Sequence, residues 1–216
     1  MQSWGVQSRY TMRDTGREPS KSGLVGLLCA ALGRPRTADI SDLAALKMGV
    51  RVDREGKLAW DYHITQQVLK ASLGGTKASE VSTRYYLADA VFLVGLEGDA
   101  ELLNGIARAL HSPRWALYFG RKAFVPAKPL KLPYGLRENE SLQVALERYP
   151  YLAARQGRNL PESLRVVMDD DGGMESRPDY PLSYAKRKFS TRRVRTILIP
   201  KPKENLKEEA TCTSPG

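Results

Sequence analysis

The stretch that most constrains the fold is residues 16–33, GREPSKSGLVGLLCAALG, which passes from polar and basic to almost wholly apolar. Read as a helix, it has Ser20 or Ser22 to cap its start and Gly33 to end it in the left-handed conformation. A helix without a polar face is normally buried. The pattern therefore predicts a helix seated closely against a sheet by a face of small residues: Gly23, Gly26, Ala30 and Gly33.

The start of this helix also predicts an anion site, because its free N–H groups lie beside Lys21 and Ser22. The same residues resemble a Walker A loop but do not satisfy its pattern. Ser20 stands where a glycine must precede the lysine, and Pro19 removes an N–H that phosphates would need. Nucleotide hydrolysis is therefore not expected.

The charge of the chain favours a polyanionic partner. Its net charge of +10 and pI of about 9.7 point first to nucleic acid, although a basic but unspecialised surface is the alternative. Residues 181–203 contain basic side chains next to Phe189 and no carboxylate, which suits phosphate contact with base stacking. The candidate nucleic-acid-binding residues are Lys21, Ser22, Arg121, Lys122, Arg187, Lys188, Arg192 and Arg193 for phosphates, and Trp4, Tyr10 and Phe189 for bases.

Other chemistry has weak support in the sequence. Cys29 and Cys212 are badly placed to pair, which indicates a reducing compartment, and two separated cysteines with two histidines give no metal-ligand spacing. The carboxylates at 169–171 follow a predicted strand in a glycine-rich stretch and are expected to form a solvated turn. His63, beside Tyr62, could act as a general base, although a structural role is commoner. We expect no metal and no cofactor.

The order of predicted elements indicates an α+β fold with two domains and a tail. Residues 1–125 match a ferredoxin-like βαββαβ pattern without its opening strand, and residues 126–200 form a small, mostly β domain. The polar tail, 201–216, is expected to be disordered. No signal peptide and no apolar run of roughly 18 residues is found, so a cytoplasmic protein with no membrane contact is expected. The predicted helices are at 16–33, 40–48, 97–111 and 141–149. The predicted strands are a hairpin from 50 that turns at 55–56, followed by strands at 83–96, 115–119, 123–125, 164–168 and 194–199. An irregular arm is predicted at 66–83 and an acidic loop at 169–181.

Several motifs, taken in this order, resemble the CasD family of type I-E Cascade, the CRISPR RNA-guided surveillance complex of bacteria: MQSWG, GREPSKSGLVGLLCAALG, DYHIT, YFGRKAFVP and RKFSTRRV. The resemblance implies an RNA-recognition-motif-like, ferredoxin-type domain that binds the 5′ handle of the CRISPR RNA between the backbone and large subunits. It implies a thumb-like arm at 66–83 that lies on the guide and a backbone subunit. Target DNA is then read indirectly, by base pairing with the guide.

Members of that family carry a further segment before MQSWG, which forms the first strand of the sheet. From the resemblance we expect a chain without it to have an unpaired sheet edge and an uncovered apolar helix. Two functions follow. The first is a non-catalytic, RNA-binding Cascade subunit. The alternative is a metal-independent endoribonuclease like related type I-C proteins, for which Tyr62, His63 and Lys122 could supply the side chains.

Overall fold

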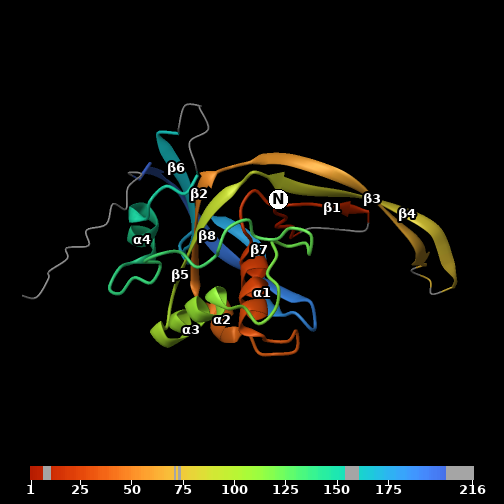
Figure 1. Cartoon of the computed structure of the whole chain (residues 1–216), viewed down its shortest axis with the longest axis horizontal. Coiled ribbons are helices and arrows are strands. Elements are labelled where there is room, and N and C mark those ends of the chain that lie inside the picture. Colours follow the sequence, from red (N-terminus) through yellow and green to blue (C-terminus); the bar gives the residue numbers. More distant parts are fainter. Residues whose placement is uncertain (7–10, 71, 73, 154–160, 203–216) are drawn as a thin grey trace, which may run out of the picture.

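The computed structural model describes residues 1–6, 11–70, 72, 74–153 and 161–202. The predicted tail lies outside these residues apart from Lys201 and Pro202, and so does the stacking candidate Tyr10. The described chain is an α+β body from which a long two-stranded ribbon projects (Figure 1). Its elements are β1 (Met12–Arg13), α1 (Lys21–Leu32), α2 (Ser41–Ala45), β2 (Lys47–Arg54), β3 (Lys57–Leu69), β4 (Thr76–Ala88), β5 (Val91–Glu97), α3 (Ala100–His111), α4 (Leu142–Arg148), β6 (Ser163–Asp169), β7 (Glu175–Ser183) and β8 (Lys188–Pro200).

Helix α1 confirms the prediction from residues 16–33. The Ser20 hydroxyl accepts the Gly23 N–H at 3.2 Å, and Gly33 ends the helix with a φ of 74°. The small-residue face of the helix was expected to pack against a sheet, but Gly23 and Gly26 instead face the side chains of two aromatic residues. A Cβ on Gly23 would lie 2.9 Å from the Trp4 ring, and Gly26 faces the Tyr184 hydroxyl. The helix is therefore covered, contrary to the expectation of an exposed apolar helix.

The predicted hairpin turn at 55–56 is wrong. Strand β2 pairs antiparallel with β5, and β3 pairs antiparallel with β4 in a different sheet. Gly56, with a φ of 75°, lies where the chain leaves the first sheet for the second, and Asp89, with a φ of 61°, lies between β4 and β5, where the chain returns. A local Glu-Gly pair looks the same in sequence whether it reverses the chain or only bends it, so strand pairing decides between the two.

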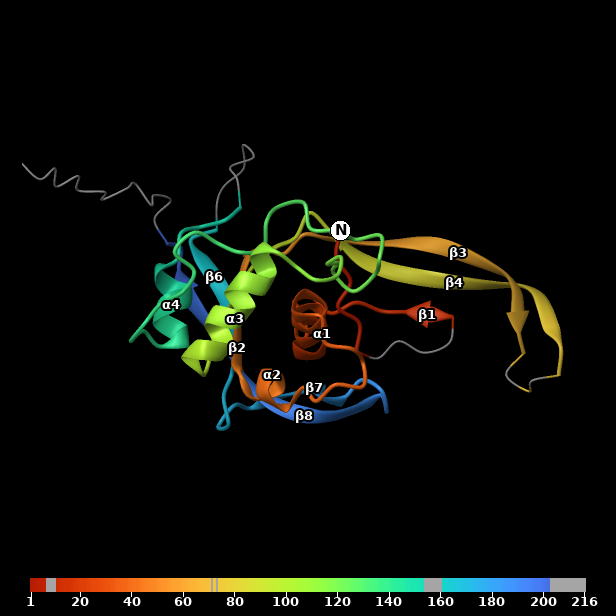
Figure 2. The same ribbon diagram turned by 60° about the horizontal axis from the view of Figure 1, so that its bottom comes forward.

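The projecting ribbon, which we call the arm, consists of β3 and β4. Its ladder runs from Lys57 opposite Ala88 to Leu69 opposite Thr76, and the Lys70 N–H donates to the Gly75 carbonyl near the tip. Residues 66–83 were predicted to be irregular, yet most of them are strand. Figure 2 shows that the distal arm has no other element beside it. Both faces are exposed there, so residues 66–69 and 76–80 lack the apolar alternation that marks a half-buried strand.

The main sheet has the strand order β5-β2-β6-β8-β7. Strand β6 pairs antiparallel with β2, from Gly49 opposite Met168 to Val52 opposite Arg165, so one sheet spans the predicted boundary between residues 125 and 126. The α+β class is confirmed, and the ferredoxin-like arrangement stays a prediction. In this sheet β5 is an edge strand among the described residues.

Two other predictions between residues 112 and 183 are wrong. The segment between α3 and α4 has no strand at 115–119 or 123–125; it buries single side chains, such as Leu117 and Phe124, against the body. The acidic loop predicted at 169–181 contains β7 from Glu175 onward. Its inward side chains include Arg177 and Asp179, which are charged and form ion pairs with other parts of the protein. Because these inward positions are not apolar, the sequence of β7 lacks the apolar alternation expected of a strand.

Two apolar clusters hold the body together. One joins α1, α2 and α3, and includes Val25, Leu28, Leu43 and Ile106. The other joins α4 to the main sheet and includes Leu146 and Val166. Figure 2 shows α1 lying between strands β7 and β8 on one side and the base of the arm on the other. Helix α1 thereby brings its N-terminus to the place where several distant segments meet.

Candidate nucleic-acid interface

A hollow of about 600 Å³ opens where the N-terminal segment, the start of α1, the base of β4 and the β7–β8 turn meet. Four arginines and a single carboxylate, Asp14, are among its described lining residues, so its walls are strongly basic. Two aromatic rings that follow β7 and begin β8 also line it. The lining residues are Ser3, Trp4, Gly5, Arg13, Asp14, Ser20, Ser22, Gly23, Arg36, Arg84, Gly120, Arg121, Tyr184 and Phe189.

Arg121 forms the centre of the basic wall. It donates to the Tyr85 carbonyl at 2.7 Å and lies 3.7 Å from the carboxylate of Asp61. Burial is the main effect on the pKa of the Arg121 guanidinium and lowers it, against a raising effect of Asp61. The positive charges of Arg84 and Arg13 lower that pKa further. An arginine stays charged at neutral pH, so these guanidinium groups repel one another and favour an anion between them.

Arg13 and Arg84 are brought together by β1, which is only two residues long. The strand pairs parallel with β4 and sets Arg13 directly opposite Arg84. Like charges opposite each other on a sheet are unfavourable. The pair is therefore better explained by a ligand with negative charge than by the stability of the sheet.

The aromatic wall of the hollow is formed by Tyr184 and Phe189. Their ring centroids are 6.3 Å apart in an edge-to-face arrangement. The Tyr184 hydroxyl donates to the Ser22 carbonyl, which fixes this wall to α1. Phe189 is 44% exposed, so its ring has a free surface on which a base can stack.

Trp4 lies at the floor of the hollow and is not free to stack on a base. Its side chain is buried, packs on Gly23 and lies 5.6 Å from the Phe119 ring. Its Nε1–H donates to the Gln2 side chain at 3.0 Å. Trp4 therefore shapes the site through packing, and the MQSWG motif has a structural role around this residue.

Lys21 and Arg192 are occupied by a buried ion cluster, contrary to the prediction that they contact phosphates. The Lys21 ammonium lies 2.8 Å from Asp169, and Arg192 pairs with both Asp169 and Asp179. The backbone N–H of Lys21 donates to Asp179 at 2.7 Å. The anion predicted at the start of α1 is thus a carboxylate of the protein itself, which the linear sequence does not place there.

The remaining candidates surround the hollow or lie away from it. Arg187 is exposed in the β7–β8 turn, Lys188 is exposed at the start of β8, and Lys122 is exposed one residue after Arg121. Arg193 is exposed and follows Arg192 in β8, and consecutive strand residues point to opposite faces. Arg193 therefore points away from the face that carries the ion cluster.

The hollow brings together four of the candidates, Ser22, Arg121, Phe189 and Trp4, and adds residues that were not among the candidates. These are Arg13, Arg36, Arg84 and Tyr184. Tyr184 could have been found, because it is close in sequence to Phe189 within the basic stretch. Arg84 and Arg13 could not, because a lone arginine in an apolar strand or an irregular segment has no recognisable pattern.

Two of the three residues of the alternative nuclease site, Tyr62 and His63, are on the arm, whereas Lys122 lies between α3 and α4. Tyr62 and His63 follow each other in β3, so their side chains point to opposite faces of the ribbon. Tyr62 is 72% exposed. Two side chains on opposite faces cannot act together on one phosphodiester within this chain. Nor does the described part of the chain contain a group of three His, Cys, Asp or Glu residues that could hold a metal ion.

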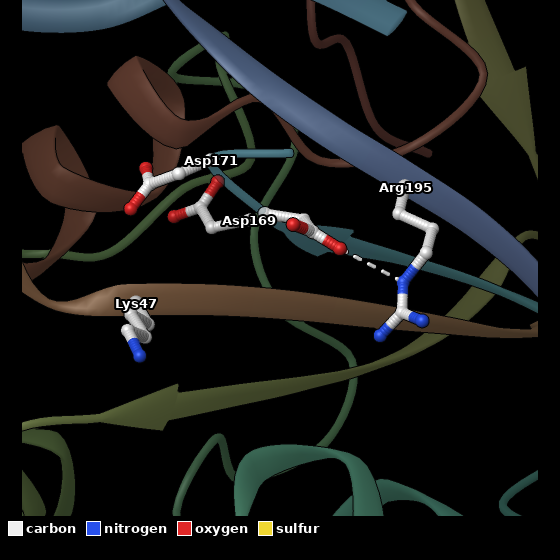
Figure 3. Close-up of a pocket in the computed structure, with 5 residues that line it drawn as sticks. Lys47, Asp169, Asp171 and Arg195 are labelled. Atoms are coloured by element: carbon white, nitrogen blue, oxygen red, sulfur yellow. Dashed lines mark ion pairs between the residues drawn. The ribbon is translucent and has the colours of Figure 1, made fainter. Parts of the chain in front are cut away.

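A second, smaller hollow of about 320 Å³ lies at the end of β6 and is lined by carboxylates. Figure 3 shows Asp169, Asp171, Lys47 and Arg195 around it. Asp170 pairs with Arg195 at 2.9 Å, and Asp169 belongs to the buried ion cluster. These carboxylates neutralise cations of the protein, so this hollow is a poor site for nucleic acid.

The arm carries an exposed apolar stripe along one face. Leu58, Trp60, Tyr62 and Ile64 alternate along β3 and are 59–72% exposed, and Val81 of β4 lies opposite Ile64. Contiguous apolar patches on a soluble protein mark interaction surfaces.

None of the helices in the described chain is long and apolar enough to cross a membrane.

Comparison with known proteins gives consistent matches. Residues 1–195 match the family model described as CRISPR-associated protein (Cas_Cas5). The chain is 34% identical over 166 residues, covering 69% of this chain and 72% of the relative, to the CRISPR system Cascade subunit CasD of Escherichia coli K12. It is also similar to a solved structure described as a crystal structure of a Cas protein (45% identity, TM-score 0.76, covering 94% of this chain and 93% of the other). A chain of a CRISPR RNA-guided surveillance complex matches with 34% identity and a TM-score of 0.77, covering 93% of this chain and 87% of the other.

Proposed function

This chain belongs to the CRISPR-associated protein (Cas_Cas5) family, and on that basis we propose that it is a non-catalytic subunit of a Cascade surveillance complex that binds the 5′ handle of the CRISPR RNA. The observation that supports this proposal best is the hollow where Arg13, Arg84 and Arg121 face the exposed ring of Phe189. One guanidinium group can donate two parallel hydrogen bonds to the oxygens of one phosphate. Aromatic rings stack on bases that are not in a duplex. A single-stranded RNA segment offers both groups.

The contacts follow from the geometry of the walls. Arg13, Arg84 and Arg121 contact the phosphates, and Phe189, held by Tyr184, stacks on a base. Arg187, Lys188 and Lys122, which surround the hollow, add attraction at longer range. Lys21 and Arg192 act indirectly, since their ion cluster fixes the start of α1 against β6, β7 and β8.

The RNA proposal is tested with the full chain and a fluorescent single-stranded RNA that carries the repeat-derived 5′ segment of the same CRISPR locus. We expect Arg13→Gln combined with Arg84→Gln to weaken binding at least tenfold and to make the salt dependence of the affinity less steep by about 1.4, at roughly 0.7 per lost phosphate contact with a single strand. Phe189→Ala should weaken binding by about 1–3 kcal/mol with an unchanged salt slope, because it removes only stacking.

Arg148→Gln combined with Lys47→Gln is the matched control, because both cations are exposed and lie away from the hollow. This variant loses the same charge and should bind RNA within twofold of the original. Equal losses in the control and in the Arg13–Arg84 variant would show that net charge alone attracts RNA. A salt slope near zero for the original chain would contradict phosphate binding altogether.

The arm supports the second part of the proposal, which is assembly. Its apolar stripe suits a protein partner, and we propose that a neighbouring Cascade backbone subunit covers it. Tyr62→Ser with Ile64→Ser should reduce the amount of other Cascade subunits that co-purify with the tagged chain. His63→Ser with Thr65→Ser changes the opposite face of the same strand and should not. Equal loss in both variants would argue against the stripe as the contact surface.

The nuclease alternative predicts a different result on the same RNA. With repeat RNA in EDTA, we expect the purified chain to leave the RNA intact, because Tyr62 and His63 point to opposite faces of the arm. Specific cleavage that His63→Ala abolishes would overturn the non-catalytic assignment. Within the proposed function, target DNA is read by pairing with the guide, and the protein holds the guide's backbone.

A further inference from the structure

The segment between α3 and α4 has an unusual balance of charge. Residues 112–137, which we call the belt, contain six Lys or Arg residues and no Asp or Glu. The chain has 34 Lys or Arg and 24 Asp or Glu, so these 26 residues supply +6 of the net +10 and the other 190 supply only +4. The belt is therefore, like residues 181–203, a stretch whose positive charge is not balanced by carboxylates along the chain.

The belt is held in place although it has no regular secondary structure. Leu117 and Phe124 are buried, and the Phe119 ring packs on Trp4. The Tyr149 hydroxyl donates to the Pro133 carbonyl at 3.0 Å, which ties the far end to the end of α4. Four prolines at positions 113, 126, 129 and 133 restrict the backbone further. The side chains between these anchors are therefore presented on an ordered surface.

The cations of the belt are mostly unused by the protein. Lys122, Lys128, Lys131 and Arg137 are all exposed, and none of them forms an ion pair with a described residue. Elsewhere most buried or half-buried cations have carboxylate partners, as Arg165 has in Glu18 and Glu55. Cations that are ordered, exposed and unpaired on one segment raise the local positive potential.

The position of the belt separates most of it from the basic hollow. Gly120 and Arg121 line that hollow, whereas residues 122–137 line neither of the two hollows described above. Figures 1 and 2 both show this green segment passing from the base of the arm, near the N-terminus, across the body to α4. The belt thus starts after α3, reaches the hollow at Gly120 and Arg121, and then leads away from it over an open surface.

We propose that the belt is a second nucleic-acid surface, which contacts the phosphates of duplex DNA without reading its sequence. A duplex keeps its bases inside and presents phosphates on its outside, so unpaired cations on an open surface suffice to bind it. A single strand instead requires grooves and rings on which its bases can stack, and the hollow supplies those. The hollow and the belt therefore suit two different nucleic acids.

The experiment compares two triple variants of the full chain for binding to a short duplex DNA of random sequence and to the handle RNA. Lys128→Gln, Lys131→Gln and Arg137→Gln together remove three belt charges that lie outside the hollow. Lys57→Gln, Lys70→Gln and Arg108→Gln remove three exposed charges from the arm and from α3. Circular dichroism and thermal melting confirm that both variants fold.

We expect the belt variant to bind the duplex at least tenfold more weakly at physiological salt and to have a salt slope less steep by about 2.7, at roughly 0.9 per lost phosphate contact. Its affinity for the handle RNA should stay within twofold, and the control variant should bind the duplex within twofold of the original. Three results would overturn the proposal: no duplex binding by the original chain, equal duplex losses in the two variants, or an equal loss of RNA and duplex binding in the belt variant. Because the RNA measurement is separate, failure of RNA binding alone would refute the proposed function and leave the belt proposal standing.

Discussion

The buried ion cluster at the start of α1 allows a quantitative prediction. Lys21 and Arg192 face Asp169 and Asp179, and the four side chains are only 5–13% exposed. Their formal charges sum to zero. Asp179→Asn removes one negative charge and leaves the cluster at +1, while Lys21→Met leaves it at −1. A double variant with both changes is neutral again.

The magnitude follows from the burial of these charges. Removing one partner of a buried ion pair costs about 3–5 kcal/mol, because the remaining charge is left uncompensated. Each single substitution should therefore lower the free energy of unfolding by about 3–5 kcal/mol, or the melting temperature by roughly 6–20 °C for a domain of this size. The double variant restores neutrality, and the side-chain amide oxygen introduced at position 179 can still accept the N–H of residue 21. We expect the double variant to lose less than the sum of the two single changes by at least about 2 kcal/mol.

Urea unfolding followed by tryptophan fluorescence measures these changes, because Trp4 is buried against α1 and reports on it. Additive losses in the double variant would refute the argument from charge balance. The handle RNA provides a second check, since Lys21 was a candidate phosphate contact in the sequence. Its side chain is 5% exposed, so Lys21→Met should not change RNA affinity at temperatures where the variant is folded.

Two further predictions concern the packing of α1. Gly23→Ala should destabilise the protein by about 1–3 kcal/mol, because the added Cβ would lie 2.9 Å from the Trp4 ring. Gly26→Ala should be neutral or stabilising by up to about 1 kcal/mol, since the atom nearest to its added Cβ is the Tyr184 hydroxyl at 3.5 Å. Urea unfolding of both variants checks this, and equal costs would show that the helix does not pack as described. Burial raises the pKa of the Tyr184 hydroxyl above its ordinary value, so its contribution to stability is complete below about pH 10, where the unfolded tyrosine is also protonated, and is lost as the pH rises further. Tyr184→Phe should therefore make the loss of stability between about pH 9 and pH 11 less steep, and an unchanged slope would contradict this assignment.

Local signals in the sequence were sufficient to locate the helices of this protein, although the helix predicted at 40–48 ends at Ala45 and β2 begins at Lys47. Ser20 and Gly33 mark the ends of α1, and Ser141 caps α4 by accepting the Val144 N–H. Capping depends on residues within one turn of each other, so the sequence contains all the information needed. The overall basic charge and the order of the motifs likewise require no structure, and they were sufficient to indicate the family.

Strand pairing could not be predicted in the same way. The sequence of β2 and β3 predicts a hairpin, because Glu55 and Gly56 separate two alternating runs. In the structure these two strands do not pair with each other: β2 pairs with β5, and β3 pairs with β4. Which strand lies beside which depends on the burial of distant side chains. The apolar face of β2 is buried under the helices, whereas β3 is exposed, and only the tertiary structure shows this difference.

The same distinction applies to the candidate interface. The sequence determined that the chain is rich in cations, but it does not distinguish among them, since a lysine or arginine has the same formal charge at every position. The tertiary structure placed Asp169 beside Lys21, 148 residues earlier in the chain, and neutralised it. It also placed Arg13, Arg84 and Arg121 around one hollow. Which cations are available to a ligand depends on their distance from carboxylates and from water, and the fold alone determines those distances.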